Sequence, residues 1–334
     1  MMIDDIKRLK EVVDTCNTVL ILAHKSPDGD AVGSAAAWFH FLKNHGKNPT
    51  IVFPDRPSSN LLSFLDNTDY LIFDLDALKV ATLSAQCDTL FCLDFNSPSR
   101  VGAEAQVIID GFKGQSAMID HHPNPTNFCG VQISRPEICS TAQLLYHCIE
   151  EMGMLTLLNT KVAEGIYLGI MTDTGSFRYP SVDANTHFIL GKLIQDGLEH
   201  FKIHEAIFDV NTIDKLQLRG FAITEKLVLI PNYPIGYISL TLNELERFNY
   251  QKGDIEGLVN VVLSIEGISV AAIFMESRDG VKISFRSKGK YHVNEFSAKH
   301  FGGGGHKYAA GGYSNDALDV TIERFKTFLV EIIE

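Results

Sequence analysis

The sequence contains no run of about 18 apolar residues, the length that a helix needs to cross a membrane, so no membrane span is expected. Its first 13 residues are charged and amphipathic, without the apolar core or cleavage site of a secretory signal peptide. The six cysteines stand at positions 16, 87, 92, 129, 139 and 148, and no two form a CxxC pair. This scatter favours buried free thiols in a reducing cytoplasm over disulfides or a zinc–thiolate site.

Positive charge is also in short supply. Lys and Arg number 29 against 41 Asp and Glu, which gives a net charge of -12. A broad basic surface for duplex DNA is therefore not expected. A short or small anionic substrate, held by a few local cations and metal ions, is compatible with this balance. The length of 334 residues favours two domains over a single core.

Strand and helix patterns alternate along the first 200 residues. Apolar runs predict buried parallel strands at 18–24, 49–53, 70–73, 89–95 and 117–122. Helical patterns cover 5–15, 31–46, 140–153, 161–175 and 184–197. This alternation predicts an α/β domain over 1–200 with a mainly parallel sheet flanked by helices.

The remaining sequence divides into a connector and a second domain. Residues 201–223 are predicted to form a helical connector without a Gly/Pro-rich spacer before Gly220. From 224 to 334, short β-prone runs alternate with turns, and a helix closes the chain at 317–334. A smaller mixed α/β domain is therefore expected there.

Acidic and histidine side chains recur where the predicted strands end, and another follows the apolar run 166–170. They are His24, Asp28, Asp30, Asp94, Asp120, His121, His122 and Asp173. A single Asp in such a position is usually a helix cap or a turn former. However, the carboxyl edge of a parallel sheet is where ligands bind, and so many carboxylates at one edge would repel one another. Divalent cations would relieve that repulsion.

The donor types indicate which ions. Carboxylates and imidazoles without thiolates favour Mn²⁺, with Mg²⁺, Fe²⁺ or Co²⁺ as alternatives. With this many acids we expect two ions that share one carboxylate. Such a pair can activate a water molecule and stabilise charge on a phosphoryl group. The pattern therefore predicts a two-metal phosphoesterase.

A glycine-rich segment stands in the second half of the chain. Gly303, Gly304 and Gly305 lie within a run of four glycines that is followed by His306. Backbone N–H groups of such a run can form an anion-binding nest, to which Arg286 and Ser287 would add donors. A flexible loop is the alternative interpretation. The run fits neither the P-loop template nor GxGxxG after a strand, so those modes of nucleotide binding are not supported.

The motifs resemble those of a known family. HKSPDGDAVGS (24–34), LDFNSPSRVG (93–102), DHH (120–122) and MTDTGSF (171–177) are similar in order and spacing to the four motifs of the DHH phosphoesterases. FRSKGKYHVNEFSAKHFGGGGHKYAAGG (285–312) resembles the signature of the DHH-associated substrate domain. The resemblance covers nearly the whole chain. Ser26 departs from the Asn often found before Pro-Asp-Gly-Asp, at a position that is not a metal ligand in the family.

The resemblance implies a role for each motif residue. The first metal would be held by His24, Asp28 and Asp94. The second metal would be held by Asp30, Asp94, His121 and Asp173, with Asp94 as the bridge. His122 would face the scissile phosphate, and Asp120 would orient a histidine. Substrate would contact Arg286, Ser287, Gly303, Gly304, Gly305 and His306, and Arg100 would either contact it or brace its own loop.

The resemblance also implies a function, in a cleft between the two domains. The two-domain layout is similar to the branch that degrades short single-stranded oligoribonucleotides and removes the 3′-phosphate of adenosine 3′,5′-bisphosphate, and it allows a homodimer. Hydrolysis of cyclic di-AMP or pApA is the nearest alternative, and exopolyphosphatase activity stays open. A pyrophosphatase is less favoured because GGGGH replaces a basic cluster. Filled ligand positions argue against a non-catalytic nucleotide-binding module, and PDGD in place of a Gly-rich turn argues against a nicotinamide-dependent oxidoreductase.

Overall fold

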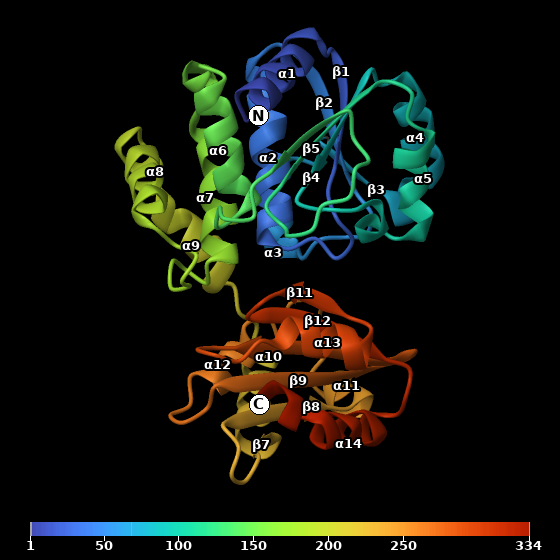
Figure 1. Cartoon of the computed structure of the whole chain (residues 1–334), viewed down its shortest axis with the longest axis vertical. Helices are drawn as coiled ribbons and strands as arrows, with labels where there is room; N and C mark the ends of the chain where they lie inside the picture. Colours follow the sequence, from blue (N-terminus) through green and yellow to red (C-terminus); the bar gives the residue numbers. More distant parts are fainter. Residues whose placement is uncertain (1, 68, 334) are drawn as a thin grey trace. The chain divides into compact units, whose positions relative to one another are not determined.

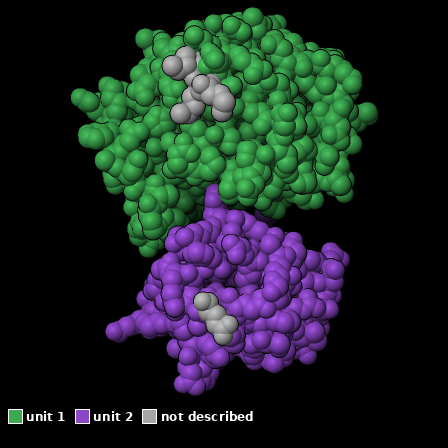
Figure 2. Space-filling model, viewed as in Figure 1, with its two compact units in different colours: residues 1–210 green, residues 211–334 purple. Residues whose placement is uncertain are grey.

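The computed structural model describes residues 2–67 and 69–333. The chain divides into two compact units, residues 1–210 and 211–334, which Figure 2 shows in separate colours. Along the described residues, no helix is long and apolar enough to span a membrane. The six cysteines are buried free thiols.

The first unit is built on a parallel sheet of six strands in the order β3-β2-β1-β4-β5-β6. The strands are β1 Thr18–Leu22, β2 Asn48–Phe53, β3 Tyr70–Ile72, β4 Thr89–Leu93, β5 Gln115–Asp120 and β6 Val131–Ser134. The chain runs from β1 outward to β3 and then returns to place β4 beside β1. The switch point between β1 and β4, where open α/β sheets bind ligands, therefore lies in the middle of this sheet.

Helices cover both faces of the sheet (Figure 1). One face packs against α1 Met2–Thr15, α2 Gly29–Asn44, α6 Thr141–Glu151 and α7 Thr160–Asp173, and the other against α4 Phe73–Gln86 and α5 Ala103–Gly111. The unit also contains α3 Ser59–Leu62, α8 Ala184–Gln195, α9 His200–Phe208 and the short 3₁₀ helices η1 Pro98–Val101 and η2 Leu155–Leu157. The predicted parallel sheet flanked by helices is confirmed. The sequence patterns did not predict β6, α4 or α5.

Close packing of α2 against α7 brings candidate ligands together. A Cβ at Gly33 of α2 would lie 2.6 Å from the carbonyl oxygen of Gly165, and one at Gly169 would lie 2.5 Å from Asp30 Oδ1. Both distances are far inside van der Waals contact, so only glycine allows these helices to approach so closely. The Ala- and Gly-rich sequence of α2 thus places Asp30 directly against α7.

The second unit is built on a mixed sheet in the order β11-β12-β10-β9-β8-β7. Its strands are β7 Leu227–Leu229, β8 Ile235–Leu240, β9 Val270–Ser277, β10 Gly280–Ser287, β11 Gly304–His306 and β12 Ala309–Ser314. Only the β8–β9 pair is parallel within this sheet. Its helices are α10 Ile213–Glu225, α11 Leu242–Arg247, α12 Leu258–Leu263, α13 Val293–Phe301, α14 Leu318–Phe328 and α15 Val330–Ile333.

Two apolar clusters hold this unit together. One joins the sheet to α13, α14 and α15, and the other joins its opposite face to α10, α11 and α12. The predicted mixed α/β character is confirmed. The single C-terminal helix predicted at 317–334 is two helices, α14 and α15, and the helical connector predicted at 201–223 is interrupted between α9 and α10.

Candidate active site

The candidate metal ligands of the first unit meet at the carboxyl ends of three neighbouring strands. His24 follows β1, Asp94 follows β4, and His121 follows β5. Asp94 adopts a left-handed backbone conformation with φ of 66°, which turns the chain immediately after β4. Asp tolerates this conformation better than most residues. The carboxylate therefore stays at the edge of the sheet, at the switch point.

Two helix ends supply the other acids. Asp28 caps the N-terminus of α2, where its side chain accepts hydrogen bonds from the N–H groups of Asp30 and Ala31. Asp30 lies in the first turn of α2, and Asp173 is the last residue of α7. The close α2–α7 packing brings these two carboxylates to the same place.

Two of the possible metal-ligand groups at this edge share one carboxylate. The first group is His24, Asp28 and Asp94, and the second is Asp30, Asp94 and His121. His24 Nε2 lies 3.8 Å from Asp28 Oδ1 and 3.5 Å from Asp94 Oδ2. His121 Nε2 lies 3.8 Å from both Asp30 Oδ2 and Asp94 Oδ1, and 3.5 Å from Asp173 Oδ2.

This arrangement suits metal ions better than hydrogen bonds. The separations of 3.5–3.8 Å are too long for hydrogen bonds, whereas ligand atoms about 2.1 Å from one ion lie roughly 3–4 Å apart. His24 Nδ1 lies 2.8 Å from the carbonyl oxygen of Lys25, and His121 Nδ1 lies 3.1 Å from that of Ile138. Each carbonyl can accept the Nδ1 proton, which leaves Nε2 as the donor atom for a metal. His24 Nε2 is buried and has no hydrogen-bond partner among the described residues.

A histidine–aspartate pair lies beside the shared carboxylate. His122 Nδ1 is 2.7 Å from Asp120 Oδ1, and the Asp120 side chain is completely buried. His122 Nδ1 also lies 3.7 Å from Asp94 Oδ1. Asp120 therefore holds the His122 ring in one orientation. Arg100 lies in η1, where its carbonyl oxygen accepts the Lys25 N–H at 2.8 Å and its side chain is exposed.

In the second unit, sheet register aligns residues of the glycine-rich segment. Arg286 on β10 and His306 on β11 both pair with Ala309 on β12. Residues paired in this way share a face of the sheet, so these two side chains belong to one row. Gly304 and Gly305 belong to the edge strand β11 and are not part of a loose loop.

Gly303, Gly305 and Ser287 are closely packed against neighbouring parts of the second unit. A Cβ at Gly303 would meet the carbonyl oxygen of Gly311, and Gly305 has φ of 139°, so neither position accommodates another residue without strain. The Ser287 hydroxyl is buried and donates to the carbonyl oxygen of Tyr291 at 2.8 Å, where it braces the loop before α13.

Comparisons with known proteins agree with this geometry. Residues 18–170 match the DHH family, N-terminal domain, and residues 235–334 match the DHHA1 domain. A solved structure, that of an exopolyphosphatase-related protein from Bacteroides fragilis, is 33% identical. The similarity covers 98% of this chain and 96% of that chain, with a TM-score of 0.93. The chain belongs to the DHH family.

Curated relatives of this DHH protein carry more specific names. The bifunctional oligoribonuclease and PAP phosphatase NrnA of Bacillus subtilis is 28% identical over 97% of this chain and 98% of its own length. The protein of the same name from Thermus thermophilus is 29% identical over 88% of this chain and 83% of its own length. The cyclic-di-AMP phosphodiesterase GdpP of Bacillus subtilis is 26% identical over 98% of this chain, which spans 49% of that longer protein.

The ionisable groups of the DHH ligand cluster shift one another's pKa values when metal is absent. Burial raises the pKa of Asp30 well above its usual range, and Asp94 and Asp173 add to this effect. Burial, with Asp28 and Asp94 nearby, raises the pKa of Asp173 to about 6 despite His121. Burial opposes protonation of His24, but attraction to the negative charges of Asp28 and Asp94 prevails and raises its pKa to about 10. These raised pKa values favour the protonated forms and so reduce the negative charge of the cluster when metal is absent.

One contributor to the site was not foreseen from the sequence. The first turn of α6 donates hydrogen bonds to Asp30 and Asp94, chiefly through Thr141. Thr141 lies in STAQ, which resembles an ordinary helix N-cap, and that is the role Ser140 plays. No pattern in the sequence marks Thr141 as a neighbour of the acidic motifs.

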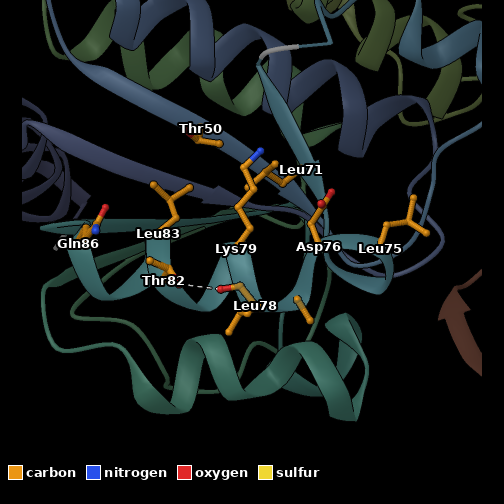
Figure 3. A pocket seen from close by; sticks show the side chains of 10 residues that line it. Thr50, Leu71, Leu75, Asp76, Leu78, Lys79, Thr82, Leu83 and Gln86 are labelled. Carbon is orange, nitrogen blue, oxygen red and sulfur yellow. Dashed lines mark hydrogen bonds between the residues drawn. The ribbon is translucent and has the colours of Figure 1, made fainter.

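A large surface pocket of the DHH unit lies elsewhere. It has a volume of about 740 Å³ and is lined by α4 and strand residues that include Leu71, Leu75, Leu78 and Lys79 (Figure 3). None of the candidate metal ligands lines it. This pocket is largely apolar and lacks the grouped acids and imidazoles that phosphoester chemistry requires.

Proposed function

We propose that this DHH protein is a metal-dependent phosphoesterase that hydrolyses short oligoribonucleotides and adenosine 3′,5′-bisphosphate. The observation that carries the proposal is the sharing of Asp94 between two ligand groups, each of which contains a correctly oriented imidazole. Two divalent ions held in this way would supply a water nucleophile and would neutralise charge on the phosphoryl oxygens. We propose Mn²⁺ as the native ion, because the ligands are carboxylates and imidazoles.

The protein's own residues would perform the remaining steps. His24, Asp28 and Asp94 would bind one ion, and Asp30, Asp94, His121 and Asp173 the other. His122, oriented by Asp120, would donate a hydrogen bond or a proton to an oxygen of the scissile phosphate. The pKa of His122 is raised: burial lowers it, but the hydrogen bond to Asp120 and the charge of Asp94 outweigh that effect. The raised pKa favours the protonated ring, the form that this role needs.

The second unit supports a nucleotide substrate. Between residues 286 and 307, five Lys or Arg side chains accompany a single acid, Glu295, in a chain that is acidic overall. The ring centroids of His292, in this basic segment, and Tyr308, directly after it, lie 6.0 Å apart. Cations combined with aromatic rings are typical of surfaces that bind short single-stranded nucleic acids. We propose that Arg100 and the row formed by Arg286 and His306, with Ser287 and Gly303–Gly305 as its frame, hold the substrate.

Domain organisation and environment complete the proposal. We assign catalysis to residues 1–200, linkage to 201–223 and substrate binding to 224–334. The similarity to two NrnA proteins, over 97% and 88% of this chain, supports the oligoribonuclease and phosphatase pair of activities. Buried free thiols and the absence of a membrane-spanning helix among the described residues are compatible with a cytoplasmic protein, and a homodimer is proposed on family resemblance alone.

Hydrolysis of cyclic di-AMP or pApA is the second candidate function. It is favoured by the similarity to GdpP, which extends over 98% of this chain. The chemistry at the metals would be the same, and only the shape of the nucleotide pocket would differ.

A parallel assay tests the proposal. Product release with Mn²⁺ is measured on a short RNA, adenosine 3′,5′-bisphosphate, pApA, cyclic di-AMP and pyrophosphate, with His122→Ala at matched metal content as the control. We expect turnover of the short RNA and the bisphosphate, and its loss in the variant. Turnover of cyclic di-AMP alone would select the second candidate. Absence of turnover on all five substrates, with two metals bound per chain, would overturn both.

A further inference from the structure

The N-terminus of α6 makes three hydrogen bonds to candidate metal ligands that belong to other elements. The Thr141 N–H donates to Asp30 Oδ2 at 2.7 Å, and the Ala142 N–H donates to Asp30 Oδ1 at 3.0 Å. The Thr141 hydroxyl donates to Asp94 Oδ1 at 2.8 Å. We infer that Thr141 is a positioning residue that orients the ligand carboxylates of both metal groups.

The hydroxyl bond fixes the plane of the shared carboxylate. Asp94 Oδ2 faces His24 Nε2 at 3.5 Å, whereas Asp94 Oδ1 faces His121 Nε2 at 3.8 Å. Each oxygen of Asp94 therefore faces a different ligand group. Rotation of the carboxylate would turn both oxygens away from those groups. A hydrogen bond to Oδ1 resists that rotation. The bond is shielded from water because Thr141 and Asp94 are almost completely buried, which strengthens it.

Threonine is well suited to this position. Its branched Cβ restricts the side chain to few rotamers, so the hydroxyl is held toward Asp94. Valine has nearly the same shape but no donor. Its backbone N–H would still reach Asp30, so Thr141→Val removes one bond of the three and leaves the other two in place.

The rest of the helix end holds Asp30. Both of its oxygens accept N–H groups of α6, and Ser34 Oγ adds a bond to Oδ1 at 3.2 Å. Ser140 is the N-cap residue of α6, and its Oγ accepts a hydrogen bond from the Gln143 N–H at 3.0 Å. The first three N–H groups of α6 thus all donate to side-chain oxygens. The positive end of the helix dipole faces the carboxylate of Asp30, a candidate metal ligand. A shift of α6 would move ligands of both ions together.

The test measures metal binding and does not depend on turnover. The inference rests on the proposed two-metal function, so wild-type protein is first titrated with Mn²⁺ by calorimetry at pH 7.5, and spin coupling of the bound pair is recorded by electron paramagnetic resonance. Thr141→Val and Thr141→Ser are compared with Thr89→Val. Thr89 is a matched control: it is equally buried, and its hydroxyl donates at 2.8 Å to a carboxylate, Asp88, at the opposite end of β4.

The outcomes separate the possibilities. We expect Thr141→Val to weaken Mn²⁺ binding by about tenfold or more, as loss of a partner that orients a ligand does, and to lose the spin coupling. Thr141→Ser keeps the donor and should stay within about threefold of wild type, as should Thr89→Val. Equal affinities for Thr141→Val and Thr89→Val, or failure of Thr141→Ser to restore binding, would overturn the inference. If Thr141→Val does not fold, Thr141→Ala removes the same hydroxyl. Wild-type protein that binds no Mn²⁺ would overturn the proposed function as well.

Discussion

Replacement of Asp173 by asparagine should change stability and metal binding in opposite directions. In metal-free protein the pKa of Asp173 is raised from 3.8 to about 6, chiefly by burial and by the nearby carboxylates of Asp28 and Asp94. The raised value means that folding disfavours the ionised form. This group therefore adds stability below pH 3.8, and that contribution is lost as the pH rises through about 6.

The magnitude follows from the shift. A difference of about two units corresponds to roughly 3 kcal/mol of unfavourable free energy once Asp173 is fully ionised at pH 7.5. Its side chain is 28% exposed, so solvent screening reduces the expected cost. A working value is about 2 kcal/mol. Asparagine has the same shape as the protonated acid and carries no charge, so Asp173→Asn should recover most of this free energy.

The assay compares thermal unfolding after removal of metal at pH 5 and pH 7.5. For a unit of this size about 2 kcal/mol corresponds to a rise in Tm of roughly 4–8 °C at pH 7.5. About half of that rise is expected at pH 5, because pH 5 lies between the unfolded pKa and the raised pKa of Asp173. With Mn²⁺ present, the variant should lose at least about tenfold in affinity, or 1.4 kcal/mol, at the second ligand group.

Asp88→Asn serves as the control of opposite sign. Asp88 accepts hydrogen bonds from Thr18 and Thr89, and its pKa is lowered: these bonds outweigh the effect of burial. Its ionised form therefore supports folding at pH 7.5, and its replacement should lower the Tm. A metal-free Asp173→Asn protein that is less stable than wild type at pH 7.5 would refute the reasoning that these carboxylates repel.

Three further predictions concern the site. Because the pKa of His24 is about 10 without metal, Mn²⁺ binding at pH 7.5 should release the Nε2 proton of this ring. In calorimetry across buffers of different ionisation enthalpy, His24→Gln should therefore lower the number of protons released by about one. His122→Ala should lower kcat by about 10²–10⁴ with metal content unchanged, whereas loss of Mn²⁺ in that variant would assign His122 to the ligands. Tyr308→Ala should raise KM for a three-nucleotide RNA more than KM for adenosine 3′,5′-bisphosphate, and equal effects would remove Tyr308 from base stacking.

Much of the first unit could be predicted because its signals are local. The runs that form β1 and β4 are apolar throughout, and a strand buried on both faces has to be so. The sharp change to His24 and Asp94 marks where each strand leaves the core. β6 was missed because its sequence, Val131–Ser134, is short and half polar, as an edge strand can be.

The polar support of the site could not be predicted in the same way. Thr141 contacts Asp30 and Asp94 from 111 and 47 residues away along the chain, and nothing in its local sequence records that contact. The glycine run shows the same limit. Its composition suggested a loop or an anion nest, but pairing with Ala309–Ser314 makes Gly304–His306 an edge strand.

The carboxylates at this edge fall into two kinds, and the difference explains how a fold can carry so many of them. Asp30 and Asp120 are buried and receive hydrogen bonds from α6 or from His122, so the protein itself orients them. Asp173, at the end of α7, receives no hydrogen bond from the described residues, and burial together with the charges of Asp28 and Asp94 raises its pKa. The protein therefore fixes the orientation of Asp30 and Asp120 by hydrogen bonds, whereas no hydrogen bond from the described residues compensates the charge of Asp173. Divalent cations would supply that compensation, so metal loading should stabilise the first unit more at pH 7.5 than at pH 5, where protons already fill part of the role.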